Sequence, residues 1–83
     1  PDAFKSELIK SIPNLRAFAV SLCHDATMAN DLVQETLLKA WQHRNKYIEG
    51  THFRAWVFTI LRNTYFSLFR KTRRENVGQA AMI

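Results

Sequence analysis

Arginine and aromatic residues alternate along the last third of this 83-residue chain. No acidic residue occurs between His52 and Arg74, whereas a merely solvated helix face carries both charge signs and few rings. Nucleobases stack on Phe or Tyr for about 1–3 kcal/mol each, and guanidinium groups pair with phosphates. The pattern favours binding of a single-stranded nucleic acid, although each ring could instead belong to the core. The alternating residues are Arg54, Phe58, Arg62, Tyr65, Phe66, Phe69, Arg70 and Arg73.

Four cations fall within five positions near the end of this segment. Cations at a helix C-terminus stabilise the helix dipole, but four exceed what a cap requires, so we interpret them as phosphate contacts. A homeodomain-like reader of duplex DNA is an alternative that does not need the rings. The four cations are Arg70, Lys71, Arg73 and Arg74.

The net charge of +5 is unevenly distributed. Residues 1–43 carry four basic and five acidic side chains, whereas residues 44–83 carry eight basic and two acidic ones. The second half is therefore expected to bind a polyanion, with nucleic acid as the first candidate. The first half is expected to have a different function.

No arrangement typical of an enzyme or a metal site is present. The three histidines have no metal-ligand spacing, and the sequence lacks a Cys pair, a glycine-rich phosphate loop and a nucleophile elbow. The single Cys23 is either a buried structural thiol or a redox sensor. We expect no catalysis, no metal and no cofactor.

No apolar run is long enough to span a bilayer, and the start of the chain resembles no signal peptide. We expect a cytoplasmic protein that does not contact membranes.

The length and the scarcity of Gly and Pro predict one small all-α domain, a compact bundle of three to four helices. Apolar positions from Phe4 to Leu22 have helical spacing, with a kink predicted near Pro13 and a helix end near Cys23. Ser11 is a plausible cap after the kink.

The central helix should run from about Ala26 to His43, with Asp25 or Thr27 as its cap and Asp31 in or near its first turn. Its second face is either an ordinary solvated surface or a docking surface, because an apolar Leu38 lies among acceptor groups. The core stripe is Leu32, Val33, Thr36, Leu37, Ala40 and Trp41, and the second face is Asp31, Gln34, Glu35, Leu38 and Gln42.

Residues 45–51 should form a loop in which Tyr47 and Ile48 either pack onto the domain or face a ligand. Thr51 is the expected cap of a long last helix from about His52 to Arg74. The expected core stripe of that helix is Phe53, Trp56, Val57, Ile60, Leu61, Thr64 and Leu68.

Two motifs, Asp31–Trp41 (DLVQETLLKAW) and Phe53–Asn63 (FRAWVFTILRN), are followed by the basic run to Arg74. Together they resemble region two of a bacterial sigma factor of the extracytoplasmic-function group. The Asn14–Ala19 stretch is similar to the alphaproteobacterial general-stress branch, and the whole resemblance covers about Ser6 to Arg74.

The resemblance implies that the central helix docks on the clamp helices of the largest subunit of core RNA polymerase, through Asp31, Gln34, Glu35 and Leu38. A loop would receive a base flipped from the non-template strand of the −10 promoter element, so that binding energy separates the strands. The loop residues are Tyr47, Ile48, Gly50, Thr51 and His52, together with Asn63. Residues Arg62, Ser67, Arg70, Lys71, Arg73 and Arg74 would hold the single strand and the upstream duplex.

The resemblance also implies an anti-sigma protein that covers the docking face. The alternative function is therefore a sigma-like interaction domain that mainly binds such a protein. We expect residues 1–75 to form the region-two domain and residues 76–83 a linker or tail toward a second DNA-binding domain that is missing here.

Overall fold

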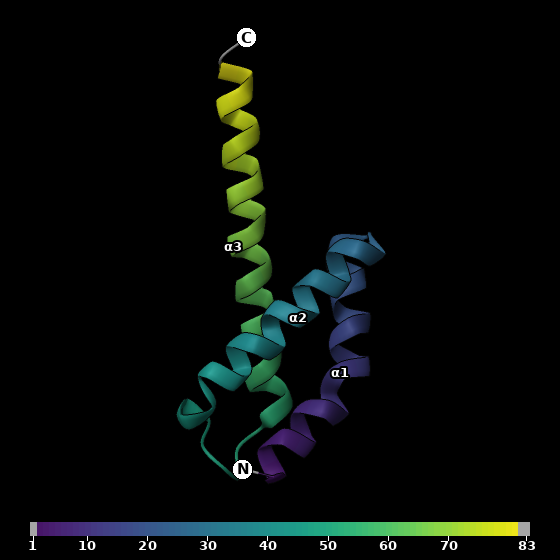
Figure 1. Ribbon diagram of the computed structural model, residues 1–83, viewed down its shortest axis with the longest axis vertical. Helices are drawn as coiled ribbons and strands as arrows, with labels where there is room; N and C mark the ends of the chain where they lie inside the picture. The colour runs from purple at the N-terminus through teal and green to yellow at the C-terminus, as the bar shows by residue number, and fades with distance from the viewer. Residues whose placement is uncertain (1, 82–83) are drawn as a thin grey trace.

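A computed structural model describes the backbone of residues 2–81 and the side chains of residues 3–68. Three α-helices and one short 3-10 turn make up this part of the chain, which contains no strand (Figure 1). The predicted all-α class is therefore confirmed. The elements are α1 (Asp2–Cys23), α2 (Ala26–Gln42), η1 (Arg44–Lys46) and α3 (Phe53–Ala81).

Helix α1 continues through Pro13 as one helix, and the kink expected there stays a prediction. The expected cap role of Ser11 is wrong. Its hydroxyl is buried inside the helix and donates to the Leu8 carbonyl at 2.7 Å, because a short side chain in a helix reaches the carbonyl of the preceding turn.

A two-residue connection joins α1 to α2. His24 has a positive φ of 55°, which ends α1, and its N–H donates to the Val20 carbonyl at 2.8 Å. The Asp25 carboxylate then accepts from the N–H groups of Thr27 and Met28 at 2.8 and 3.2 Å, so one of the two predicted caps is confirmed. Asp31, expected in or near the first turn, lies in the second turn of α2.

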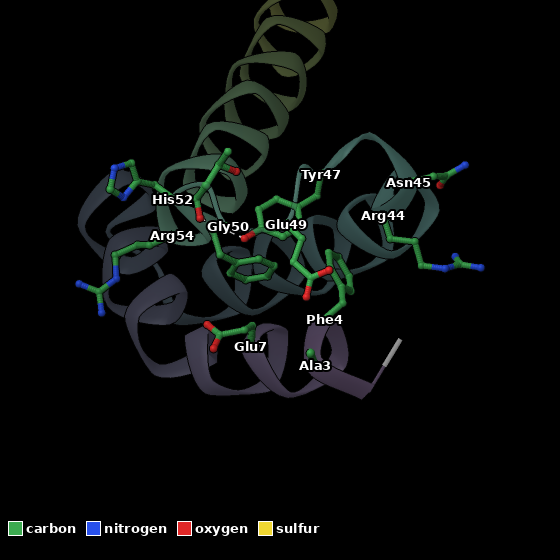
Figure 2. Close-up of a pocket in the computed structure, with 12 residues that line it drawn as sticks. Ala3, Phe4, Glu7, Arg44, Asn45, Tyr47, Glu49, Gly50, His52 and Arg54 are labelled. Atoms are coloured by element: carbon green, nitrogen blue, oxygen red, sulfur yellow. Dashed lines mark hydrogen bonds between the residues drawn. The ribbon is translucent and has the colours of Figure 1, made fainter.

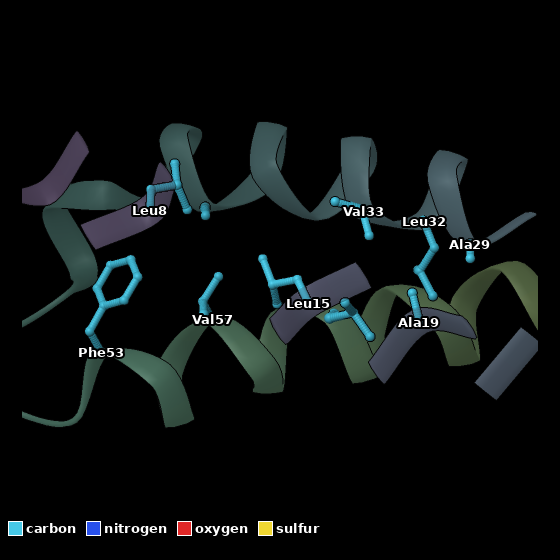
Figure 3. Close-up of a cluster of buried hydrophobic side chains, with 10 residues drawn as sticks. Leu8, Leu15, Ala19, Ala29, Leu32, Val33, Phe53 and Val57 are labelled. Atoms are coloured by element: carbon cyan, nitrogen blue, oxygen red, sulfur yellow. The ribbon is translucent and has the colours of Figure 1, made fainter. Parts of the chain in front are cut away.

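The core lies where the three helices pack against one another. Leu8 and Phe53 lie at one end of the buried cluster and Ala19 and Ala29 at the other (Figure 3). Small side chains at the α1–α2 connection let the two helices approach closely, and larger ones fill the space where they diverge. The cluster consists of Leu8, Leu15, Ala19, Ala29, Leu32, Val33, Ala40, Phe53, Val57 and Leu61.

Two threonines complete this core without leaving a polar group unpaired. Thr36 and Thr64 are buried, and their hydroxyls donate at 2.7 Å to the carbonyls four residues earlier, Leu32 and Ile60. Each threonine thus presents mainly its methyl group to the core.

Two residues expected in the core stripes are exposed. Trp41 is 42% exposed and Leu68 is 43% exposed. Both lie at the far end of their stripes. In Figure 1 the second half of α3 extends alone beyond the bundle, so no neighbouring helix covers that part of it.

Helix α3 continues to Ala81 and does not end near Arg74 as expected. No proline interrupts the segment after Arg74, so the helix can continue past the basic run. The side chains of Phe69, Arg70, Lys71, Arg73 and Arg74 lie outside the described residues, so their expected DNA contacts stay predictions.

Candidate functional site

The loop between α2 and α3 is closed by its own hydrogen bonds. The N–H and the hydroxyl of Thr51 both donate to the Ile48 carbonyl, the N–H at 3.2 Å. Gly50 has a φ of 91°, as the third residue of a type II turn requires. The Tyr47 hydroxyl donates to the Thr51 carbonyl at 3.1 Å and ties the two ends of the turn together.

Thr51 does not cap α3, and that prediction is wrong. Its hydroxyl bonds to Ile48 inside the turn, and a side chain held there is not free for the amides of the next helix. The His52 carbonyl instead accepts the first bond of α3, from the Trp56 N–H at 3.1 Å. His52 is therefore the residue at the N-cap position of α3, and its imidazole is exposed.

Aromatic rings hold this loop against the bundle. The Tyr47 ring lies 5.9 Å from that of Phe4, 5.2 Å from Phe53 and 5.3 Å from Trp56, measured between centroids. Tyr47 is half-buried, whereas Ile48 is 70% exposed. Of the two fates considered for these side chains, Tyr47 packs onto the domain and Ile48 projects into solvent. Sequence periodicity gave no sign that Phe4 belongs to this cluster.

A pocket of about 710 Å³ opens beside the loop (Figure 2). Its wall combines the N-terminal turns of α1, η1, the loop and the first residues of α3. Figure 2 shows Arg44 and Asn45 extending on one side and His52 and Arg54 on the other. The volume lies within the range typical of small-ligand sites. The lining residues are Ala3, Phe4, Glu7, Arg44, Asn45, Tyr47, Glu49, Gly50, Thr51, His52, Phe53 and Arg54.

The outward face of α3 continues from this loop. Eleven residues at 100° each separate His52 from Asn63, so the two positions share one face, about 16 Å apart along the axis. Arg62, Asn63 and Ser67 are exposed. The Arg62 guanidinium lies 5.5 Å from the Phe66 ring centroid, a cation–π distance.

The rings of α3 divide between core and surface. Phe58 stacks on Phe18 at 5.2 Å, with planes 14° apart, and packs against the buried cluster. Tyr65 is half-buried beside the same cluster. Phe66 is 41% exposed. The structure thus assigns Phe58 to the core and leaves Phe66 half-exposed, with its ring 5.6 Å from the Tyr65 ring and beside Arg62.

A second exposed surface lies on α2. Asp31, Gln34 and Glu35 are exposed, and Leu38 is 54% exposed. All four expected docking residues therefore share the side of α2 opposite the buried Leu32, Val33, Thr36 and Ala40.

Arg44 is a candidate residue that sequence reasoning missed. Its guanidinium lies 4.2 Å above the Trp41 ring, and its Nη1 donates to the Trp41 carbonyl at 2.7 Å. The three-residue spacing of Trp and Arg at a helix end is the signal that could have revealed the pair.

Cys23 is half-buried against the core. Burial raises the pKa of its thiol, and the Asp25 carboxylate raises it further. A raised pKa disfavours the reactive thiolate, which supports the structural role over the redox role.

Among the described residues, no group of His, Cys, Asp and Glu side chains could hold a metal ion. Within the same part of the chain, no helix is long and apolar enough to cross a membrane.

Residues 8–75 match the family described as Sigma-70 region 2. The chain is 47% identical over 74 residues to the ECF RNA polymerase sigma factor EcfG of Rhodopseudomonas palustris, which covers 89% of this chain and 41% of that protein. It is 44% identical over 61 residues to the ECF RNA polymerase sigma factor SigL of Mycobacterium tuberculosis, covering 72% of this chain and 34% of that one.

A solved structure resembles the whole chain. The sigma factor RpoE of Bartonella quintana, in complex with the anti-sigma factor NepR, matches with a TM-score of 0.88 and 44% identity. The match covers 100% of this chain and 51% of the other. The chain thus spans about half or less of the length of these relatives.

Proposed function

Because this chain belongs to the Sigma-70 region 2 family, we propose that it is a transcription initiation module that docks on core RNA polymerase and melts the −10 promoter element. The identities to EcfG and to RpoE of Bartonella quintana confirm the resemblance to the extracytoplasmic-function group and its general-stress branch. Sigma factors are not enzymes, in agreement with the sequence. We propose that the module separates the DNA strands in the cytoplasm and that binding energy drives this separation.

The bonded loop beside the pocket is the observation that carries this proposal. A base flipped out of a duplex loses a few kcal/mol of stacking, and a receptor that is already ordered offsets more of that cost because it loses less free energy to its own ordering. The Tyr47 hydroxyl, the Gly50 turn and the aromatic cluster hold the loop before any ligand binds. We propose that the loop residues Tyr47, Ile48, Gly50, Thr51 and His52 capture one base of the non-template strand.

The outward face of α3 would hold the rest of the DNA. Asn63 lies on the same face of α3 as His52, about 16 Å farther along the axis, so we propose that it contacts the strand that leads to the captured base. Arg62, directly before Asn63, and Ser67, about one turn after it, would contact the same strand. Arg70, Lys71, Arg73 and Arg74 are proposed contacts to the strand and the upstream duplex.

The α2 surface would bind protein. Asp31, Gln34 and Glu35 supply exposed acceptors around a half-exposed Leu38, an apolar centre within a polar rim. We propose that this surface docks on the clamp helices of the largest polymerase subunit. The negative first half of the chain would then face protein and the positive second half DNA.

Binding of single-stranded −10 oligonucleotides to the complex with core polymerase tests base capture. Each non-template base is replaced in turn, and affinity is measured by fluorescence anisotropy. We expect one position to lose affinity at least tenfold on replacement. Equal affinity for every sequence would reject base capture while leaving polymerase docking intact.

The second candidate is a domain whose main partner is an anti-sigma protein. The resemblance to a sigma factor solved in complex with NepR favours this reading, and the exposed α2 surface would be its target. Reconstituted promoter opening with core polymerase decides between the two. Opening that needs the exposed α3 residues supports initiation, whereas binding of the anti-sigma protein without any opening supports the alternative.

We also propose that residues 76–83 lead toward a second DNA-binding domain. Fusing such a domain to Ile83 should raise promoter affinity, and unchanged affinity would contradict this connection.

A further inference from the structure

The end of α2 and the η1 turn carry a fixed cation that the proposed DNA contacts do not include. The Arg44 guanidinium lies 4.2 Å above the exposed Trp41 ring and uses one of its five N–H donors on the Trp41 carbonyl. Both contacts restrict a side chain that is otherwise flexible. An anion that binds Arg44 therefore loses less affinity to side-chain ordering than it would at a free arginine.

A capping role explains only part of this arrangement. Arg44 follows the C-terminus of α2, where a cation satisfies a carbonyl and complements the dipole. One N–H suffices for that purpose, and four remain. Arg44 is exposed and also lines the pocket, so these donors are available at the rim.

The pocket has a cation on each side. Arg44 extends on one side of the loop and Arg54 on the other, as Figure 2 shows. Glu7 and Glu49 line the space between them. Carboxylates repel phosphates, so a strand that crosses the pocket keeps its phosphates at the two arginines and directs an uncharged base inward.

We propose that Arg44 is a phosphate clamp for the single strand. A phosphate next to the captured base binds the Arg44 guanidinium, and the strand crosses the pocket between Arg54 and Arg44. This inference rests on the proposed function and extends the DNA path from α3 and the loop to the end of α2. The exposed Lys46 in the same turn adds positive charge beside the clamp.

The salt dependence of oligonucleotide binding tests the clamp. Arg44→Gln is compared with wild type and with Lys10→Gln, a matched loss of one exposed cation on α1 outside the pocket. In the complex with core polymerase, each single-strand phosphate contact contributes about 0.7 to the slope of log affinity against log salt. We expect Arg44→Gln to lower the slope by about that amount and the affinity severalfold. Lys10→Gln should change neither.

Neutral methylphosphonate linkages, placed one at a time along the oligonucleotide, locate the phosphate. One linkage beside the captured base should weaken wild type and leave Arg44→Gln unaffected. Urea unfolding of Arg44→Gln identifies any folding defect, and Arg44→Lys, which keeps the charge without the planar stack, should bind with intermediate affinity.

Two outcomes separate the clamp from the proposed function. An unchanged slope for Arg44→Gln, in a complex that still prefers one base, would overturn the clamp alone. A wild-type complex with no base preference at any position would overturn base capture as well.

Discussion

The Tyr47 hydroxyl donates to the Thr51 carbonyl across the loop that joins α2 to α3, at 3.1 Å. The ring of the same tyrosine lies 5.2 Å from Phe53 at the start of α3. One side chain therefore connects the shape of the turn to the packing of the bundle. A loop held in this way presents Ile48 and His52 to solvent from a fixed backbone.

Removing this hydroxyl should separate loop order from folding. Tyr47→Phe keeps the ring cluster and loses one exposed hydrogen bond, at a cost of about 0.5–1.5 kcal/mol at most. We expect a small loss of stability in urea unfolding but a clear loss of discrimination between −10 bases. Tyr47→Ala, which also removes the ring, should destabilise the fold much more. Full discrimination by Tyr47→Phe would show that the bond is dispensable for capture.

Gly50 should resist substitution because of its backbone conformation. A Cβ at this position would meet no atom within 4 Å, so crowding plays no part. The φ of 91° alone should cost an alanine about 1–2 kcal/mol. Gly50→Asn, which tolerates positive φ better, is the control and should cost less. Equal unfolding free energies for Gly50→Ala and wild type would mean that the turn is not maintained in solution.

Two leucines on α2 should behave in opposite ways. Leu32 is 1% exposed and Leu38 is 54% exposed. Leu32→Ala should lower the free energy of unfolding by about 2–5 kcal/mol, because it opens a cavity in the core. Leu38→Ala should change stability by less than about 0.5 kcal/mol and yet weaken polymerase binding. Polymerase affinity unchanged by both Leu38→Ala and Glu35→Ala would remove the α2 surface from the docking site.

Cys23 should make stability fall at high pH. Burial raises the pKa of the folded thiol above its ordinary value of 9.0, with Asp25 adding to the effect. The unfolded chain therefore loses this proton first as the pH rises. The Cys23 contribution is complete below pH 9.0 and is lost as the pH rises through the folded pKa. Urea unfolding from pH 7 to 10 should show a smaller decline for Cys23→Ala than for wild type.

Helical periodicity predicted most of the core because it depends on local spacing alone. Leu32, Val33, Thr36 and Ala40 are buried as the central stripe required. The same spacing could not show how far along each helix the neighbouring helices cover the apolar stripe. Trp41 and Leu68 continue their stripes past the covered region and are exposed.

Hydroxyl partners were harder to predict than helices. Ser11 and Thr51 were both expected to cap a helix, and each donates instead to a carbonyl three residues earlier. A short polar side chain has several partners within reach, and the backbone conformation decides among them. Asp25 was one of two caps predicted from the polar turn, and its extended backbone lets its carboxylate accept from the N–H groups of Thr27 and Met28.

The candidate site was predicted in part. Exposure of Asp31, Gln34, Glu35 and Leu38 followed from the pattern opposite the core stripe. The pocket did not, because it joins residues of α1 to a loop some forty positions later in the chain. Arg44 was missed because Trp41 was expected in the core, whereas the contact with Arg44 needs an exposed Trp41 ring.

Fluorescence of 2-aminopurine, placed at each non-template position of the −10 element in turn, tests base capture most directly. Stacking on neighbouring bases quenches the fluorescence of 2-aminopurine. Its fluorescence therefore changes when it leaves the stack and enters the pocket. With the polymerase complex bound, we predict that the change is largest at one position and that Tyr47→Phe, which keeps the fold, reduces it there. Fluorescence that stays quenched at every position, while the complex remains bound, would contradict the account.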